Sequence, residues 1–426
     1  MSPPSPRAQT PTTGLHQAVQ ALRAEPAGIA DARALGQQAG VARTRLTELC
    51  QRHYHLSPNA LIERARVDAA RSALAEGARA ASAGSDAGFA SEPAYARSFQ
   101  QYQGLTPAAY RTLASSGRAS AFTLRLPAGF ATEPVRHLMA RDPSSASERV
   151  LETHAHGLRL ERGFQDEREQ KAAVLHLTVR GRDAHVHITP RSGSTCTPAQ
   201  RLAAHAVARR LLGFETHLPA LRAQARRAEC AWFAPLLARR PGLRVPLMGS
   251  EYEALIWAIL GQQVNLTFAA QLRAELIRLA QPALCADHPQ LLPHPAPVQV
   301  AGLDPAELQR RRFSRSKAHW IVDLSAAIAE GHLRLQALSL GPADEAYAAL
   351  VARKGIGDWT AQYVMLRGMG YNDCVPAADA GLMRNLHGIL GTPERPKADD
   401  VARCLAPFAP ARSVACQHLW AWQAGF

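Results

Sequence analysis

Two short features of this sequence combine residue types and spacing that could support chemistry. The first is a turn with two glycines, Gly355-Ile356-Gly357, between an apolar helical pattern and the start of a new helix. Glycines let the backbone come close to a phosphate, and the N–H groups at the start of the next helix can bind it. The second is Asp379, which follows a Pro376 turn and opens another helix. Such an aspartate either caps the helix or supplies a negative charge to a developing cation.

The turn and the aspartate together resemble the helix-hairpin-helix DNA glycosylase superfamily. The resemblance implies a hairpin that holds duplex DNA through Gly355, Gly357 and Thr360, and it implies that Asp379 is the catalytic carboxylate. Residues 252–264 resemble the opening helix of the AlkA branch, the 3-methyladenine DNA glycosylase II enzymes. The stretch from Arg412-Ser413 to Trp420 resembles that branch's last helix. The resemblance covers roughly residues 120 to 426.

The same resemblance implies a base pocket and a wedge. Trp359, Tyr363 and Trp420 match the pocket aromatics of the AlkA branch, and plain core packing is the alternative for each of them. A cationic base stacks well on electron-rich rings. Gln263 occupies the position from which an apolar side chain fills the hole left by a flipped base. Glutamine can hydrogen-bond to the orphaned partner base, but it stacks less well.

The implied reaction is hydrolysis of a glycosidic bond. An N-alkylated purine carries positive charge, so its glycosidic bond is already weak. Departure of the base leaves an oxocarbenium-like sugar. An ionised Asp379 would stabilise that cation and orient or activate water. Trp359 stands where strand-cutting relatives place the lysine that forms a Schiff base, so we expect a monofunctional enzyme that leaves an abasic site. Oxidised or deaminated bases are the alternative lesions.

No cofactor is expected to be required. The hairpin of this superfamily usually holds a monovalent cation, Na⁺ or K⁺, on backbone carbonyls, which here would be those of Val351, Arg353 and Ile356. The seven cysteines are scattered and never spaced as C-x-x-C. We therefore expect reduced thiols, no zinc and no iron–sulfur cluster.

The first quarter of the chain holds two similar stretches, 35–58 and 83–107, in which a helix, a glycine turn and a second helix lead to a Ser/Thr-Pro step. The second stretch, through residues 88–99 and 104–111, resembles the AraC family of transcriptional activators. The resemblance implies two recognition helices in successive major-groove segments. The candidate DNA contacts, for which ordinary surface positions are the alternative, are Arg43, Thr44, Arg45, Glu92 and Arg97.

The two resemblances together suggest fusions of the Ada/AlkA type. The Ada sensor module needs four zinc-binding cysteines ahead of the AraC-like part, and no cysteine precedes Cys50. Activation of transcription by damage through that module is therefore not expected. The leading interpretation is a monofunctional glycosylase for alkylated purines with an appended sequence-specific DNA-binding module. The alternative is a transcriptional regulator or DNA-binding protein with a weak or inactive glycosylase half.

The sequence predicts a multidomain fold for the helices and strands that must position these residues. We expect an all-α double helix-turn-helix, an α+β domain like the TBP-like N-terminal domain of the AlkA branch, and an all-α helix-hairpin-helix domain. Alternation at 122–126, 174–179 and 186–188 predicts strands, and the period of 199–212 predicts a helix. The predicted parts are a disordered lead 1–14, a helix-turn-helix domain 15–114, a linker 115–120, an α+β domain 121–218 and a glycosylase domain 219–426.

The charge balance favours a nucleic-acid partner. Lys and Arg number 49 against 35 Asp and Glu, a net charge of +14. The expected partner is double-stranded DNA, either damaged or promoter DNA, with RNA polymerase as a further partner of a regulator. No run of about 18 apolar residues exists, so no membrane span is expected. No secretory signal is visible, and we expect a cytoplasmic, nucleoid-associated bacterial protein that is monomeric, as these glycosylases usually are.

Overall fold

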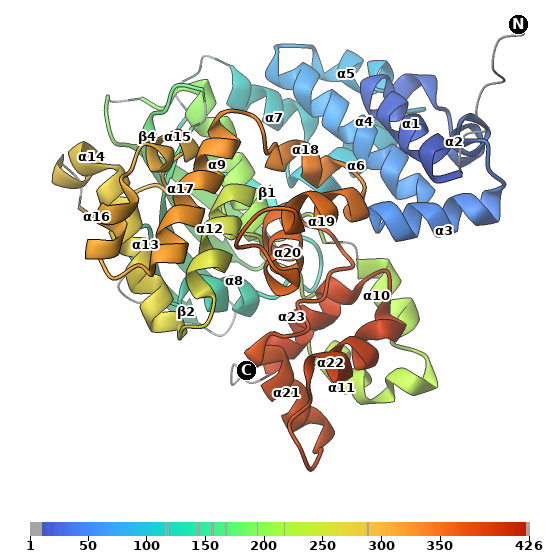
Figure 1. Ribbon diagram of the computed structural model, residues 1–426. Coiled ribbons are helices and arrows are strands. Elements are labelled where there is room, and N and C mark those ends of the chain that lie inside the picture. Colours follow the sequence, from blue (N-terminus) through green and yellow to red (C-terminus); the bar gives the residue numbers. More distant parts are fainter. Residues whose placement is uncertain are drawn as a thin grey trace, which may run out of the picture. The chain divides into compact units, whose positions relative to one another are not determined.

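The computed structural model divides the chain into two compact units (Figure 1). The first unit contains the residues up to 102 together with 106–112, and the second contains 103–105 and the chain from 113 onward. The first is helical, and the second combines an antiparallel sheet with helices, which confirms the predicted fold class. The structure describes residues 11–115, 117, 119–142, 145–154, 157–166, 168–193, 195–216, 218–287 and 289–422.

The first unit is built from short helices joined by tight turns. They are α1 (Pro11–Ala24), η1 (Pro26–Gly28), α2 (Ala32–Ala39), α3 (Arg43–Tyr54), α4 (Pro58–Ala75), α5 (Ala80–Asp86), α6 (Glu92–Gln103) and α7 (Pro107–Ala114). Both predicted glycine turns are present, because Gly40 between α2 and α3 has φ +68° and Gly88 between α5 and α6 has φ +87°. A Cβ at Gly88 would also lie 2.7 Å from the Cα atom of Ala27. The predicted duplication of helix, glycine turn and helix is thus confirmed.

The prediction of a disordered lead is wrong for residues 11–14, and residues 1–10 lie outside the described part of the chain. Helix α1 already begins at Pro11, where a proline suits the first helical position. Its buried residues Leu15, Ala18, Val19 and Leu22 repeat at helical spacing. Packing of this stripe stabilises the helix and extends it back over the polar residues that the composition assigned to a disordered lead.

The second unit contains a five-stranded antiparallel sheet in the order β1-β5-β4-β3-β2. The strands are β1 (Ala121–Arg125), β2 (Glu148–His154), β3 (Gly157–Gln165), β4 (Ala172–Arg180) and β5 (Asp183–Pro190). The three alternating stretches of the sequence lie in β1, β4 and β5, as predicted, and His176 pairs with His187 across the last two. Helix α9 (Pro198–Leu211) packs against the sheet, and its predicted start is capped by Thr197.

The remaining helices of the second unit follow almost without interruption. They are α8 (Glu133–Met139), α10 (Leu218–Gln224), η2 (Ala228–Phe233), α11 (Ala234–Arg239), α12 (Glu251–Gly261), α13 (Leu266–Ala280), α14 (Pro282–Asp287), α15 (Pro297–Ala301), α16 (Pro305–Arg310), α17 (Arg315–Ala329), α18 (Leu335–Leu340), α19 (Ala343–Val351), α20 (Asp358–Val364), the π-helix η3 (Met365–Met369), α21 (Ala380–Leu390), α22 (Ala398–Leu405), η4 (Ala406–Phe408) and α23 (Arg412–Trp422). The predicted boundary at 218/219 falls in the first turn of α10.

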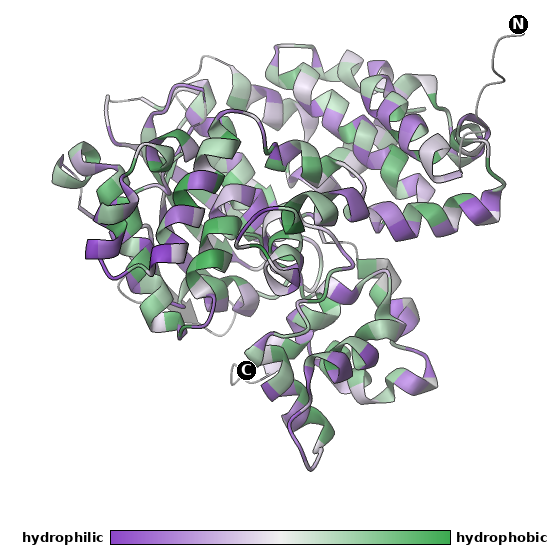
Figure 2. Cartoon of the chain, viewed as in Figure 1, coloured by the Kyte–Doolittle hydropathy of each residue, from purple (hydrophilic) through white to green (hydrophobic). Residues whose placement is uncertain are grey.

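Helix α12 lies at the centre of this region. Every residue from Tyr252 to Leu260 is buried, and much of the helix has the hydrophobic green of Figure 2. A helix that is buried all round is covered on all sides by other elements. None of the described helices is both long and apolar enough to cross a membrane.

Four charged side chains are buried where the sheet meets α12 and α13, and we call them the buried charge cluster: Glu148 on β2, Arg162 on β3, Glu253 on α12 and Arg273 on α13. The Nη1 atom of Arg273 lies 2.7 Å from Glu148 Oε1, and its Nη2 atom lies 2.8 Å from Glu253 Oε1. Arg162 contacts both glutamates. Burial alone would raise the pKa of each glutamate, but the two guanidinium groups lower both pKa values below the ordinary range.

The segment predicted as a linker is held by a buried arginine of α9. Arg201 donates through Nε to the carbonyl of Leu113 at 2.9 Å, through Nη1 to that of Gly117 at 2.8 Å, and through Nη2 to that of Ser115. Burial lowers the pKa of this arginine. The carbonyls of Leu113, Ser115 and Gly117 therefore supply acceptors that make the burial of Arg201 tolerable.

We predict that Arg162→Met will lower the free energy of unfolding by about 3–5 kcal/mol, because it leaves Glu148 and Glu253 buried with one guanidinium between them. Urea unfolding followed by circular dichroism measures this loss. Arg125→Met is the matched control, because its ion pair with Asp183 at 2.7 Å is 45% and 42% exposed; it should cost less than about 1 kcal/mol. Similar losses in the two variants would contradict a structural role of the cluster.

Candidate functional site

The two glycines of the 355–357 turn are glycines for different structural reasons. Gly355 has φ +86°, and a Cβ at this position would lie 2.5 Å from the Cδ2 atom of Trp320 on α17. Gly357, the N-cap of α20, has φ −90° and ψ 180°, and a Cβ there would meet no atom within 4 Å. Gly355 is thus required by the fold, whereas the missing side chain at Gly357 leaves the start of α20 open to a close-approaching group.

The turn is supported from inside by a side chain of the α12 end. The Nε2 atom of Gln262 donates to the carbonyl of Gly355 at 2.8 Å and to Thr360 Oγ1 at 2.9 Å. Thr360 is 2% exposed. Its hydroxyl is therefore committed to Gln262, and the predicted contact of Thr360 with a DNA backbone rests on its main-chain N–H group.

Asp379 takes part in two hydrogen bonds through one oxygen. Oδ1 accepts the N–H of Leu382 at 2.9 Å, which makes Asp379 the N-cap of α21, and it also accepts the indole N–H of Trp420 at 2.9 Å. The alternative that Asp379 caps a helix is thus correct: its side chain accepts a main-chain N–H of α21. Neither bond uses Oδ2 of this half-buried carboxylate, so helix capping leaves that oxygen available to accept a further hydrogen bond or to face a positive charge.

A buried arginine lies behind Trp420. Arg367, in the π-helix η3, places its Cζ atom 4.5 Å from the centroid of the Trp420 ring, and its Nη1 atom donates to the carbonyl of Pro246 at 2.9 Å. Burial, together with the positive charge of Arg141, lowers the pKa of Arg367 to about 10, although Tyr363 and Asp379 act in the opposite direction. Trp420 is thus fixed by a cation on its face and a carboxylate at its N–H. A π-helix at such a place is common at functional sites.

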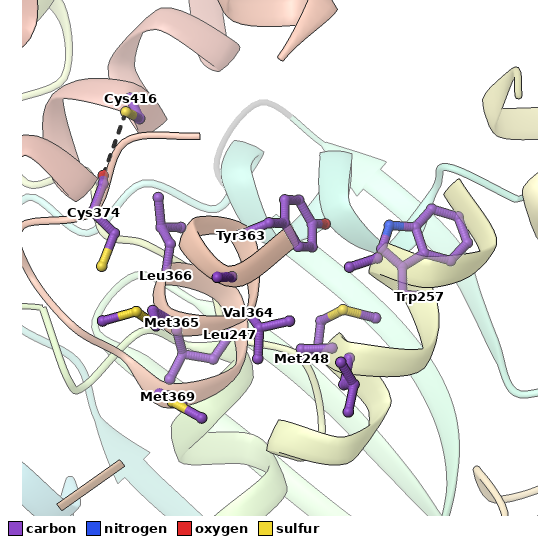
Figure 3. Packing of buried hydrophobic residues seen from close by; sticks show 14 of the residues in the cluster. Leu247, Met248, Trp257, Tyr363, Val364, Met365, Leu366, Met369, Cys374 and Cys416 are labelled. Carbon is purple, nitrogen blue, oxygen red and sulfur yellow. Dashed lines mark hydrogen bonds between the residues drawn. The ribbon is translucent and has the colours of Figure 1, made fainter. Parts of the chain in front are cut away.

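Trp359 and Tyr363, one helical turn apart on α20, form a stacked pair with ring centroids 5.3 Å apart and planes at 28°. Figure 3 shows Tyr363 among the buried side chains of the surrounding cluster, which also includes Trp257 and Leu366. The Nη1 atom of Arg141 donates to the Tyr363 hydroxyl at 3.1 Å. The indole N–H of Trp359 is buried and has no acceptor within the described residues. Such a group at a predicted pocket calls for a partner outside the protein.

The loop that leads to Asp379 is tied to α23 by its first two residues. Arg412 forms a two-pronged ion pair with Asp373, at 2.7 Å from Nε to Oδ1 and 2.8 Å from Nη2 to Oδ2. The buried hydroxyl of Ser413 donates to the carbonyl of Tyr371 at 2.7 Å. Helix α23 therefore holds the aspartate loop at one end and Trp420 at the other.

Gln263, the predicted wedge, lies in the turn between α12 and α13. Its side chain is exposed and its φ is +55°, in the left-handed region that few non-glycine residues adopt. Leu266, at the start of α13, is also 55% exposed. The turn thus presents side chains to solvent, as the wedge prediction requires.

The carbonyls predicted to hold a monovalent cation lie at the end of α19 and in the following turn. Val351 is the last residue of α19, where carbonyls lack helical partners and the helix dipole is negative. The carbonyl of Arg353 accepts the N–H of Ile356 at 3.2 Å, which leaves one lone pair. These hard oxygen donors fit a monovalent cation, and the site stays a prediction.

The five candidate DNA contacts of the first unit are exposed: Arg43, Thr44, Arg45, Glu92 and Arg97. The first three begin α3 and the last two lie on α6, the second helix of each repeat. Arg45 forms an exposed ion pair with Glu48 at 3.0 Å. Tyr95 and Phe99 of α6 are buried, as a core stripe requires, and Tyr102 is half-buried.

Sequence reasoning missed the residues that hold the site in place. Gln262, Lys317, Arg141 and Arg367 are polar residues within or beside apolar helical patterns. A charged residue in a buried stretch such as 363–369 is a signal that something compensates it. The sequence does not say what, because the compensating groups lie far away in the chain.

Comparison with known proteins assigns two parts of the chain. Residues 35–112 match the family described as a helix-turn-helix domain. Residues 256–410 match the HhH-GPD superfamily base excision DNA repair protein. The second match includes the hairpin, Asp379 and the wedge turn.

Three curated relatives each align with about 40% of the length of this chain. DNA-3-methyladenine glycosylase 2 of Escherichia coli is 32% identical over 44% of this chain and 64% of that protein. A DNA-3-methyladenine glycosylase of Bacillus subtilis is 28% identical over 42% of the chain and 59% of that protein. A probable bifunctional transcriptional activator/DNA repair enzyme AlkA of Mycobacterium tuberculosis is 34% identical over 43% and 36%. The matches span less than two thirds of these relatives.

Among solved structures, a 3-methyladenine DNA-glycosylase from Archaeoglobus fulgidus superimposes with a TM-score of 0.55. It covers 72% of this chain and 99% of its own, at 20% identity. An 8-oxoguanine glycosylase/lyase from Clostridium acetobutylicum gives a TM-score of 0.52 at 12% identity, over 72% and 97%. These likenesses show the fold of the second unit, in which sheet and helices occur together.

We predict that Gly355→Ala will lower the free energy of unfolding by about 2 kcal/mol or more, because the φ is unfavourable and the Cβ collides with Trp320. Gly357→Ala is the matched variant. Its φ is ordinary and its surroundings are open, so stability should change by less than about 1 kcal/mol. Thermal and urea unfolding measure both. Equal losses would mean that the two glycines are required for the same reason.

Proposed function

The chain joins an AraC-type helix-turn-helix domain to a HhH-GPD domain, and on this basis we propose that it is a monofunctional DNA glycosylase that excises alkylated purines of the 3-methyladenine type from duplex DNA. The relatives named for 3-methyladenine support the substrate class. The appended helix-turn-helix module would bind DNA in its own right.

The observation that carries this proposal is the arrangement of Asp379. Its Oδ1 atom is occupied by Leu382 and Trp420, which orients the carboxylate, and Oδ2 is used by neither bond. An oriented carboxylate can stabilise the positive charge that develops on the sugar when the base leaves. It can also orient or activate the attacking water.

The predicted pocket aromatics suit a flipped cationic base. The half-buried Trp359 offers an electron-rich ring, the buried Tyr363 stacks against it, and Trp420 is held beside Asp379. A cationic purine leaves the duplex stack and gains stacking on such rings. Departure of the base needs no strong acid, because alkylation has already placed positive charge on it.

Trp359 also supports base excision without strand cleavage. Its indole cannot form a Schiff base with the sugar, which requires an amine. Lys354, the nearest lysine in the chain, is an exposed residue on the other side of Gly355. The product would therefore be an abasic site in an intact strand.

The hairpin would hold the lesion strand by its phosphates. Gly357 leaves the N–H groups at the start of α20 open, and Gln262 supports the turn from behind. A monovalent cation on the carbonyls of Val351, Arg353 and Ile356 would add positive charge near that phosphate.

The first unit supports a second DNA-binding role. Exposed arginines on α3 and α6, each the second helix of a repeat, would reach bases or phosphates of the major groove. The name of the Mycobacterium tuberculosis relative includes a transcriptional activator, which favours promoter DNA and RNA polymerase as partners of this unit. A regulator with an inactive second unit is the competing candidate.

We predict that Asp379→Asn will reduce release of bases from methylated duplex DNA at least about a hundredfold, the scale expected for loss of one transition-state interaction. Asparagine can still cap α21 and accept from Trp420, so duplex affinity and stability should stay near wild type. Asp399→Asn, a charge removed at an exposed position of α22, should release bases normally. Wild-type protein that binds DNA but releases no base would favour the regulator.

We predict that a chain beginning at Gln103 will retain base release, whereas one beginning at Ala119 will be unstable. Residues 103–105 belong to the second unit, and the carbonyls of Leu113, Ser115 and Gly117 bind Arg201. Without them the buried guanidinium keeps, among the described residues, the Cys196 carbonyl as its acceptor, at a cost of about 3 kcal/mol or more. Thermal unfolding and base release measure both chains. Equal stability would show that the 113–117 main chain is dispensable.

A further inference from the structure

A buried ammonium group lies under the wedge turn. Lys317, on α17, is 8% exposed, and its Nζ atom donates to the carbonyls of Leu260 and Gln262, both at 2.8 Å. These carbonyls belong to the end of α12, where helical partners are missing and the dipole is negative. Burial lowers the pKa of Lys317. An ammonium at this depth is costly, so its two bonds hold the α12 end in one conformation.

Gln262 extends this support to the hairpin. Its main-chain carbonyl is bound by Lys317, while its side chain donates to the carbonyl of Gly355 and to Thr360 Oγ1. One residue is thus fixed at its backbone by α17 and at its side chain by the hairpin. Movement of the α12 end would break hydrogen bonds at both places.

The same helix contacts the hairpin directly. Trp320 lies one turn after Lys317 on α17, and its ring occupies the space that a Cβ at Gly355 would need. Helix α17 therefore supports the wedge turn through Lys317 and the hairpin through Trp320. The distance between the two elements is set by one rigid helix.

Gln263 immediately follows the fixed residue. Its φ of +55° is uncommon for glutamine, and such a conformation persists only where the surroundings determine it. The bonds of Lys317 and Gln262 supply that determination, because they fix the peptide just before Gln263. The exposed side chain is presented to solvent as a result.

We propose that Lys317 is a positioning residue that, through Gln262, holds the wedge at Gln263 in a fixed relation to the 355–357 hairpin. The proposal rests on the proposed function, since it assigns a purpose to the wedge and the hairpin. A hairpin bound to a phosphate would then place the wedge side chain at the base step of the lesion. Filling the hole in the stack would not require a separate ordering of the turn.

The test uses the full chain and a short duplex with a tetrahydrofuran abasic-site analogue opposite 2-aminopurine. The fluorescence of 2-aminopurine reports a side chain that enters the gap, and competition with the intact duplex gives the preference for the abasic duplex. Lys317→Met, which keeps the length of the side chain and removes its donors, should reduce this preference about tenfold and abolish most of the fluorescence change. Affinity for the intact duplex should stay within about twofold.

Two variants bracket this result. Gln263→Ala, which removes the wedge itself, should reproduce both losses. Lys171→Met removes an exposed lysine that pairs with Glu169, and it should change neither. Should Lys317→Met fail to fold in circular dichroism, Gln262→Met breaks the same connection from the hairpin side, leaves the Lys317 bonds to the main chain intact, and carries the same expectation.

Three outcomes would overturn the positioning role. One is an unchanged preference and fluorescence in Lys317→Met. Another is an equal loss of affinity for abasic and intact duplexes, which would mean that Lys317 only maintains the fold. The third is a wild-type protein that does not prefer the abasic duplex. Base release from methylated DNA, measured in parallel, tests the proposed function separately: an inactive wild type that still prefers the abasic duplex rejects the glycosylase and leaves the positioning role in place.

Discussion

The buried charge cluster is the constraint on which the arrangement of the second unit depends. Glu148 and Arg162 belong to the sheet, whereas Glu253 and Arg273 belong to the two helices that flank the wedge turn. Each buried charge is acceptable only while its partners are in place. Sheet and helices therefore cannot shift against each other without exposing an uncompensated charge. This rigidity gives the α12 end a fixed reference, from which Lys317 and Gln262 extend to the hairpin.

At the candidate site, the proposed catalytic carboxylate also has a structural role. Asp379 caps α21 and receives Trp420 through one oxygen, so the bonds that fold the helix also orient the carboxylate. Arg367 covers one face of Trp420, and Arg412 and Ser413 hold the preceding loop. Orientation by supporting residues is what a charge-stabilising catalytic group needs.

The sequence predicted the local elements well, because each depends on neighbouring residues. The positive φ values at Gly40 and Gly88, the strands β1, β4 and β5, and the cap at Asp379 follow from residue type and period. The disordered lead was wrong at residues 11–14, where burial of a short apolar stripe outweighed composition. Gly357 and Gly355 look alike in the sequence, and only Trp320, 35 residues before Gly355 in the chain, separates their roles.

By itself the sequence determined which residue types are present for chemistry: a glycine turn, an aspartate after a proline turn, and a tryptophan just after the glycine turn. The kinds of helices and strands around them were determined there as well, since periodicity is local. Only the tertiary structure decided which side chains support them. Lys317 reaches the α12 end, Arg201 reaches the 113–117 main chain, and Arg367 reaches Trp420. Buried charges select their partners by proximity in the folded core, and sequence spacing carries no record of that proximity.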